Sequence, residues 1–391
     1  MSPRGADVVV VGAGAIGLAS AWRAAQRGLT VTVVDPRPGR GASWMAAGML
    51  APVSEVHTEE EPLLQLALAA AARWPSFAAE LEEAAGCAIG YGAAGTLIVA
   101  ADDGDRAWAR ELLDVQRGLG LEARWLTARQ ARALEPALAP SVRGAIDVAG
   151  DHQVDNRLLV GALLAAARRS GVALRTVRAA SLLGSGTAVT GVRLADGEVL
   201  RTGAVVLAAG CWSSGIEGVP AGAVPPVRPV KGEILRLRPA PGAPALARTV
   251  RAVVGGSSVY LVPRGDGTVV VGATVEERGF DTEVRAGGVY RLLRDAHRVV
   301  PGITEMVLEE AGAGLRPGSP DNAPIVGHCP APGGGTVAGL VLATGHYRNG
   351  ILLTPPTADA VAALLTGEGP LPAMAPFTPA RFGAAPARAG T

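Results

Sequence analysis

Residues 7–35 constrain the fold of this chain most strongly. Four consecutive valines at residues 8–11 are followed at once by the sequence GAGAIG, and a second apolar strand at residues 30–34 ends at Asp35. An uninterrupted apolar run of this length is typical of a central parallel strand buried on both faces. The order of strand, glycine-rich turn, helix and strand predicts an α/β sheet that binds a dinucleotide.

Each glycine of this turn has a separate role in that prediction. Gly12 permits the tight turn, Gly14 lets the backbone approach a pyrophosphate, and Gly17 lets the helix pack closely on the strand. The helix N-terminus then presents its amide groups to the phosphates. Asp35 stands at the spacing at which a carboxylate accepts hydrogen bonds from an adenosine ribose. The alternative is a tight strand-to-helix turn that binds nothing.

Composition excludes several classes of function. The 36 Lys and Arg residues nearly balance the 35 Asp and Glu residues, which argues against nucleic acid or an anionic membrane as the main partner. The only three cysteines, Cys87, Cys211 and Cys329, are far apart, and we expect them to be buried, reduced and unconnected with any metal. Asp7 and three glycines interrupt the apolar run that follows Arg4, so we expect no secretory signal but a soluble, cytoplasmic protein.

At 391 residues the chain suits two packed domains, each built from separate segments. Another buried parallel strand, residues 204–209, ends at Gly210, whereas residues 225–311 have an antiparallel pattern with a hairpin that carries Tyr260. Tyrosine at such a position is more often a half-buried strand residue than a catalytic one. We expect an α/β domain formed by residues 1–88, 149–224 and 312–391, and a mainly antiparallel α+β domain formed by residues 89–148 and 225–311.

Two further segments have the composition of ligand-binding loops. Residues 36–52 are rich in glycine and alanine, so that backbone can pass close to a flat ligand, and Ser43 offers a hydroxyl to a phosphate; an ordinary flexible connection explains the composition nearly as well. Near the end of the chain, Thr354 and Pro355 mark a helix start. The positive end of that helix faces residues 345–350 and would stabilise negative charge there.

The motifs GAGAIG, SWMAAGM, the hairpin tyrosine, GLRPGSPDNAPIVG and ATGHYRNGILL together resemble the FAD-dependent amino-acid oxidases of the D-amino-acid oxidase and sarcosine oxidase type. The resemblance runs from about residue 6 to 367 and is greatest to the glycine-oxidising members that serve thiamine biosynthesis. It implies a Rossmann-like FAD-binding domain with a second, mainly antiparallel α+β substrate domain. Cys329 does not fit the motif for covalent attachment, so the resemblance implies non-covalent FAD.

The resemblance also implies roles for particular residues. Arg316 and Arg348 would bind the substrate carboxylate, for which a planar, permanently charged guanidinium is suited, and Tyr260 would add a hydrogen bond. Arg348 has the alternative of lying over the flavin edge. The residues expected to bind FAD are Gly12, Gly14, Ala15, Ile16, Gly17, Asp35, Pro36, Ala42, Ser43, Ala47, Gly48, Met49, Ala180, Gly210, His346, Tyr347, Arg348, Asn349, Gly350, Ile351 and Leu352. Family members often have glutamate in place of Asp35 and valine in place of Ala180.

The reaction implied is the oxidative deamination of glycine and similar small amines to glyoxylate and ammonia, with dioxygen reduced to hydrogen peroxide. The same motifs serve oxidases or dehydrogenases of sarcosine, proline or D-amino acids. An alternative from another class is a dinucleotide-binding sensor or assembly subunit without catalysis. Retention of both arginines argues against it. We further expect a homo-oligomer, either a dimer or a tetramer.

Overall fold

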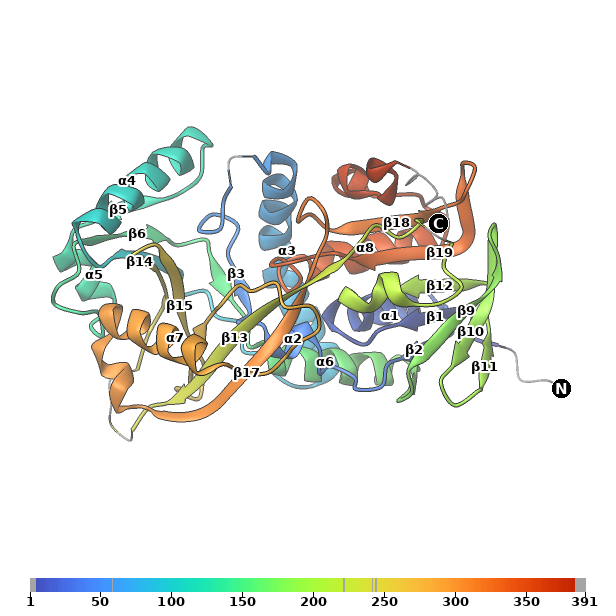
Figure 1. The fold of residues 1–391 in the computed structure, drawn as a ribbon, viewed down its shortest axis with the longest axis horizontal. Coiled ribbons are helices and arrows are strands. Elements are labelled where there is room, and N and C mark those ends of the chain that lie inside the picture. The colour runs from blue at the N-terminus through green and yellow to red at the C-terminus, as the bar shows by residue number, and fades with distance from the viewer. Residues whose placement is uncertain (1–4, 58, 221, 241, 243–244, 384–391) are drawn as a thin grey trace.

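Two large sheets form the protein in the computed structural model, which describes residues 5–57, 59–220, 222–240, 242 and 245–383. One sheet has nine strands and contains the N-terminal strand; the other has eight strands and lies at the opposite end of the molecule (Figure 1). The long strands β13 (Arg228–Arg238) and β17 (Val307–Gly318) belong to the eight-stranded sheet and extend toward the nine-stranded one. The predicted α/β class with a second, mainly antiparallel part is confirmed.

The nine-stranded sheet has the order β11-β10-β19-β12-β1-β2-β8, with β18 paired to β19 and β9 to β10. Strands β19, β12, β1, β2 and β8 pair in parallel. The strands are β1 (Val8–Val11), β2 (Val31–Val34), β8 (Ala173–Arg175), β9 (Ala179–Ser185), β10 (Ala188–Leu194), β11 (Val199–Arg201), β12 (Ala204–Leu207), β18 (Ile325–Pro330) and β19 (Thr336–Thr344).

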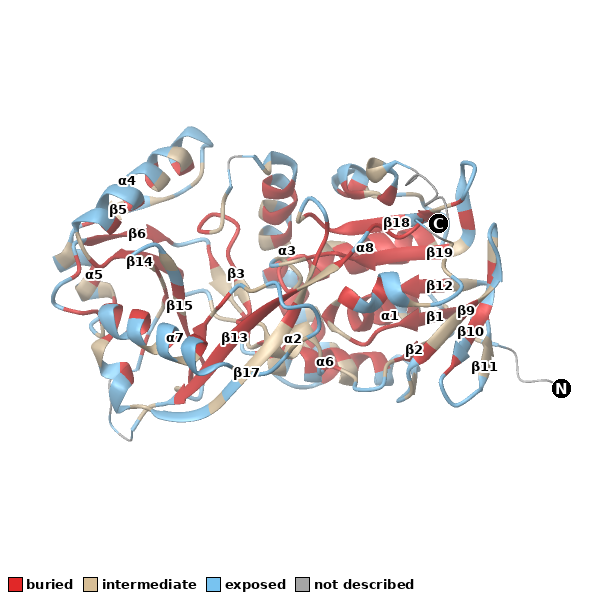
Figure 2. Ribbon diagram, viewed as in Figure 1, coloured by how far each residue is buried: buried red, intermediate tan, exposed pale blue. Residues whose placement is uncertain are grey.

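Strand β1 is buried on both faces, as its four valines predict. Val9 and Val10 are both 0% exposed, and Figure 2 shows the middle of this sheet as buried. Because side chains alternate along a strand, Val8 and Val10 join the core beneath the helices, whereas Val9 and Val11 join the core on the side of β9 and β10. The helices of the first core are α1 (Ala15–Gln26), α3 (Glu61–Ala85), α6 (Asn156–Arg169) and α8 (Thr354–Leu365).

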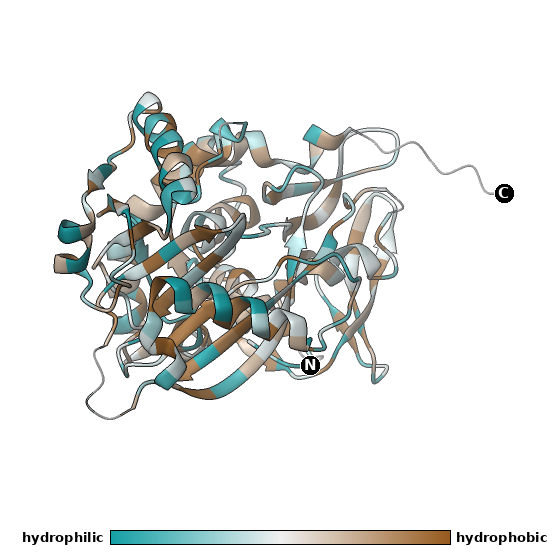
Figure 3. Cartoon of the chain, turned by 60° about the vertical axis from the view of Figure 1, so that its left-hand side comes forward, coloured by the Kyte–Doolittle hydropathy of each residue, from teal (hydrophilic) through white to brown (hydrophobic). Residues whose placement is uncertain are grey.

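The eight-stranded sheet has the order β17-β13-β16-β15-β14-β4-β6-β5 and is antiparallel except where β14 pairs with β4. Its other strands are β4 (Thr96–Ala100), β5 (Arg124–Leu126), β6 (Gly144–Val148), β14 (Thr249–Val254), β15 (Ser257–Pro263) and β16 (Val269–Gly272). The remaining α-helices of the described residues are α2 (Ala42–Met45), α4 (Asp103–Gly118), α5 (Ala128–Leu134) and α7 (Ala286–Val299). Strand β3 (Met49–Leu50) pairs with β7 (His152–Gln153). Brown apolar segments follow the strands, and teal residues recur along the outer helices (Figure 3).

One local prediction is confirmed and another is wrong. Asp155 caps α6 by accepting hydrogen bonds from the backbone amides of Arg157 and Leu158. The expectation that all three cysteines are buried is wrong for Cys87, which is exposed, whereas the other two are buried. The stretch around Arg316 forms the long strand β17, which is paired with β13 along its length.

Candidate active site

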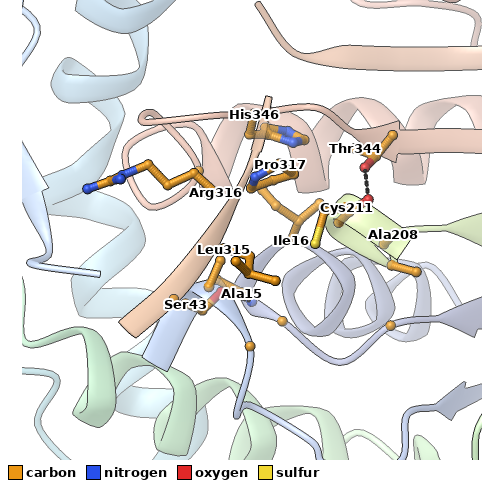
Figure 4. Close-up of a pocket in the computed structure, with 18 of the residues that line it drawn as sticks. Ala15, Ile16, Ser43, Ala208, Cys211, Leu315, Arg316, Pro317, Thr344 and His346 are labelled. Carbon is orange, nitrogen blue, oxygen red and sulfur yellow. Dashed lines mark hydrogen bonds between the residues drawn. The ribbon is translucent and has the colours of Figure 1, made fainter. Parts of the chain in front are cut away.

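A cavity of about 900 Å³ is lined by residues of both sheets. It borders the end of β1, the start of α1, residues 34–49, the end of β12, β17 and residues 343–352 (Figure 4). All the predicted FAD-binding residues line it except Gly17, together with Arg316 and Tyr260. Gly17 instead lies against the glycine turn, since a Cβ there would be 1.9 Å from the carbonyl oxygen of Gly12. That contact is the close helix packing that the motif predicts.

One end of the cavity is formed by the glycine turn and the N-terminus of α1. Gly12 adopts a φ of +108°, which favours glycine. The Asp35 carboxylate accepts hydrogen bonds from the amides of Ala13 (2.8 Å) and Arg37 (2.7 Å). Ser43 accepts a hydrogen bond from the amide of Ala15 (3.0 Å). Asp35 and Ser43 therefore hold the turn itself, in addition to any contact with a ligand.

This end of the cavity fits an anionic dinucleotide. Helix α1 begins after Gly14 with no acidic residue in its own first turn, and its positive end faces the cavity. Arg37 and Arg40 add positive charge to the lining. The volume of about 900 Å³ is also far larger than a small amino acid needs, given that a water molecule takes about 30 Å³ in the liquid. The lining thus fits a long ligand that contains a diphosphate, such as FAD.

His346 stands where the lining reaches α8. Its side chain is 2% exposed, and Nε2 lies 3.0 Å from the hydroxyl of Thr357. Burial lowers the pKa of His346 to about 3, so the imidazole is neutral at physiological pH. Thr354 donates a hydrogen bond to the carbonyl of Gly350 (2.8 Å), which fixes the turn that enters the helix.

Arg316 extends from β17 toward the other end of the cavity, away from Ala15 and Ile16 (Figure 4). Its Nη1 donates to the carbonyls of Thr274 (3.2 Å) and Lys231 (3.3 Å). Gly232 leaves room for the guanidinium, because a Cβ there would lie 2.3 Å from Nη1. Two carbonyls and one glycine therefore fix the direction of this side chain.

Tyr260 of β15 lies in the same lining, opposite Arg251 of β14 in the strand register. It also passes over a glycine: a Cβ on Gly272 would be 2.4 Å from the phenol oxygen. Burial raises the pKa of Tyr260 above its ordinary value, so the phenol remains a hydrogen-bond donor at physiological pH.

Arg348 differs from Arg316 in its surroundings. Its residue is exposed at the edge of the cavity, Nη2 lies 3.2 Å from Nε2 of His57, and the guanidinium is 5.1 Å from the centroid of the Tyr347 ring. The two predicted anchor residues thus line one cavity, but only Arg316 is held by backbone carbonyls. The substrate-binding role of each arginine stays a prediction.

Sequence reasoning missed Glu55, Gly232 and Gly272. Glu55 lines the cavity, and its Oε1 lies 2.5 Å from Nη1 of Arg251. Burial alone would raise the pKa of this carboxyl, but the charges of Arg251, Arg348 and Arg316 outweigh it and lower the pKa. In the sequence, Glu55 precedes an acidic run that resembles an exposed helix start, and both glycines sit in ordinary strands. No local pattern distinguishes them.

Within the described residues, no group of three or more His, Cys, Asp or Glu side chains is arranged to hold a metal ion. The same residues include no helix that is both long and apolar enough to cross a membrane.

The sequence matches the family model of FAD dependent oxidoreductases over residues 7–364. It is 34% identical to the bifunctional protein ThiO/ThiG of Trichormus variabilis over 380 residues, 96% of this chain and 55% of that protein. It is 31% identical to the hydrogen cyanide synthase subunit HcnC of Pseudomonas aeruginosa in an alignment of 416 positions that covers 97% of each chain. The crystal structure of glycine oxidase from Geobacillus kaustophilus matches with a TM-score of 0.86 at 34% identity, covering 95% of this chain and 98% of that one.

The chain thus spans about half the length of the bifunctional relative, and nearly the whole of the other two. The matched residues include the glycine turn, helix α1 that follows this turn, and residues at both ends of the cavity. This chain belongs to the family of FAD-dependent oxidoreductases.

Proposed function

We propose that this protein oxidises glycine to glyoxylate and ammonia and passes the electrons to dioxygen, which yields hydrogen peroxide. The observation that carries the proposal is Arg316, a guanidinium held over Gly232 inside the cavity whose other end fits the diphosphate of FAD. A small amino acid supplies the carboxylate that such a guanidinium binds. The similarity to a glycine oxidase over most of both chains supports the same substrate.

In this proposal the protein contributes mainly position and charge. Thr274 and Lys231 engage Nη1 of Arg316, and the rest of the fork faces the substrate carboxylate. Tyr260 donates a hydrogen bond from its protonated phenol to the same carboxylate. FAD, which the glycine turn and the start of α1 would hold, would supply the hydride acceptor for the substrate carbon and the route of the electrons to dioxygen. Holding the substrate in one orientation removes much of the entropic barrier to that reaction.

His346 and the start of α8 supply the electrostatic environment at the other face of the cavity. The imidazole is neutral and fixed by Thr357, so it adds no positive charge that would compete with Arg316 for the carboxylate. The N-terminus of α8 points its backbone dipole toward residues 346–352, where it favours negative charge. Arg348, which is exposed and lines the cavity, adds attraction for the substrate carboxylate as it enters.

We further propose that the product serves thiazole formation for thiamine, that the protein works in the cytoplasm and that it assembles as a dimer or tetramer. The similarity to a bifunctional ThiO/ThiG protein supports the first point. Light scattering of the purified protein tests the assembly, and cell fractionation tests the location.

The experiment is a substrate panel with the purified, FAD-loaded protein. Glycine, sarcosine, proline and D-alanine are compared for hydrogen peroxide release, for glyoxylate in the case of glycine, and for reduction of an artificial electron acceptor without oxygen. Peroxide and glyoxylate from glycine support the proposal. Dye reduction without peroxide identifies a dehydrogenase, and a higher kcat/KM for another amine replaces glycine as the substrate.

A second candidate is a subunit of a larger flavin-dependent assembly, and the similarity to HcnC over nearly the whole of both chains favours it. A subunit of that kind would bind FAD but show no turnover alone with any amine of the panel. Copurification of the native protein with its partners distinguishes this outcome from simple loss of activity.

A further inference from the structure

Glu55 places a negative charge in the cavity, within reach of the charges of Arg316 and Arg348. The carboxylate lines the same cavity as Arg316 and Tyr260. Its lowered pKa keeps it ionised at physiological pH. A cavity meant for a simple carboxylic acid gains nothing from such a group, because it repels the ligand. A zwitterion, in contrast, complements both signs of charge.

The position of Glu55 is fixed from two sides. Arg251 of β14 binds Oε1 at 2.5 Å, which leaves Oε2 without a partner among the described residues. The buried carboxylate of Asp151 accepts hydrogen bonds from the backbone amides of Val53 (3.1 Å) and Ser54 (2.7 Å) and so holds the turn that precedes Glu55. The side chain is only 19% exposed, and the residue lines the cavity.

We propose that Glu55 is a substrate-binding residue that receives the amino group of the zwitterion while Arg316 holds its carboxylate. This inference rests on the proposed oxidation of an amino acid. The ionised carboxylate attracts the ammonium form as it enters and accepts a hydrogen bond from the amine in either protonation state. Glu55 thereby makes the site prefer an amino acid over the matching hydroxy acid.

A purely structural role for Glu55 would be to neutralise Arg251 and keep residues 51–57 in place. The two roles predict different behaviour toward ligands that lack an amine. Glycolate has a hydroxyl where glycine has its amino group, so it engages Arg316 but offers no cation to Glu55. Loss of the negative charge therefore weakens the binding of glycine but not that of glycolate, whereas collapse of the turn weakens the binding of both.

The test compares Glu55→Gln with the wild type and with Glu59→Gln, a control at an exposed glutamate outside the cavity. All three are loaded with FAD. The KM for glycine comes from peroxide release, and the Kd for glycolate comes from calorimetry. We expect Glu55→Gln to raise the KM for glycine by about tenfold or more, which corresponds to about 1.4 kcal/mol, with glycolate bound as tightly as before or more tightly. Glu59→Gln should change neither value.

The proposal would be overturned if Glu55→Gln weakened the binding of glycine and glycolate equally, or if it changed the binding of neither. Glu55→Asp keeps the charge on a shorter arm, and its KM for glycine should lie between those of the wild type and Glu55→Gln. If Glu55→Gln fails to hold FAD, the aspartate variant carries the same comparison: a raised KM for glycine with unchanged glycolate supports the role. A wild type that binds glycine by calorimetry yet releases no peroxide contradicts the proposed function. The binding role of Glu55 is then tested by calorimetry with both ligands, and a selective loss of glycine binding in Glu55→Gln supports it.

Discussion

Replacing Arg316 by alanine is expected to raise the KM for glycine by about 100- to 1,000-fold while FAD remains bound. A guanidinium that meets a carboxylate with two charge-assisted hydrogen bonds contributes about 3 to 4 kcal/mol in a partly buried site, which corresponds to that range. The carbonyls of Thr274 and Lys231, which hold Nη1 in the wild type, would then turn toward water in the emptied space. FAD should stay, because the glycine turn and α1 lie at the other end of the cavity.

The assay measures peroxide release over a wide range of glycine concentrations, with the ratio of flavin to protein absorbance as the check on FAD content. Arg316→Lys serves as the graded variant, since an ammonium retains the charge but not the planar fork, and we expect about a tenfold rise in KM. A KM within about threefold of the wild type in Arg316→Ala, with FAD bound, would refute the assignment of Arg316 to the substrate carboxylate.

Three further predictions follow from the same contacts. Gly232→Ala should raise the KM for glycine without loss of FAD, since its Cβ would lie 2.3 Å from Nη1 of Arg316, whereas Gly265→Ala, at a glycine with no atom within 4 Å of the added Cβ, should match the wild type; equal kinetics of the two variants would contradict the clash. Tyr260→Phe should raise the KM about fivefold, the effect of one hydrogen bond worth about 1 kcal/mol, and an unchanged KM would remove the phenol from the site. His346 has a pKa of about 3 in the folded protein and an ordinary value of 6.5, so only the unfolded chain takes up its proton between these values and stability falls as the pH drops below 6.5. At pH 5 this loss is about 2 kcal/mol, and urea unfolding at pH 7.5 and pH 5 should show a smaller decline for His346→Gln than for the wild type; an equal decline would contradict the buried, neutral imidazole.

The nucleotide-binding half of the cavity was predictable because its determinants are local. The valines of β1, the turn at Gly12 and the carboxylate of Asp35 occur within one short stretch, and their backbone demands are visible in the residue types. The same holds for the cap of α6 at Asp155, where the accepting carboxylate and the donating amide of Arg157 are close neighbours in the chain.

The substrate half was predictable only through the resemblance of its motifs to a family. Gly232 and Arg316 are distant in the sequence, and their contact exists because β13 and β17 pair in register. Strand β17 contains several glycines and a proline, which are residue types that favour loops over strands. Its pairing with β13 overrides that local preference. In the sequence, Glu55 resembles an ordinary surface charge. Only the fold shows its ion pair with Arg251, a residue of β14.

The most direct test of the central claim is to mix the FAD-loaded protein with glycine in the absence of oxygen and follow the absorbance of the oxidised flavin. We predict that the absorbance is lost in the wild type, with a saturable dependence on glycine, and that Arg316→Ala needs at least about 100-fold more glycine for half-saturation. An absorbance that persists in the wild type at saturating glycine, or the same half-saturation in both proteins, would contradict a guanidinium-anchored amino acid held beside FAD.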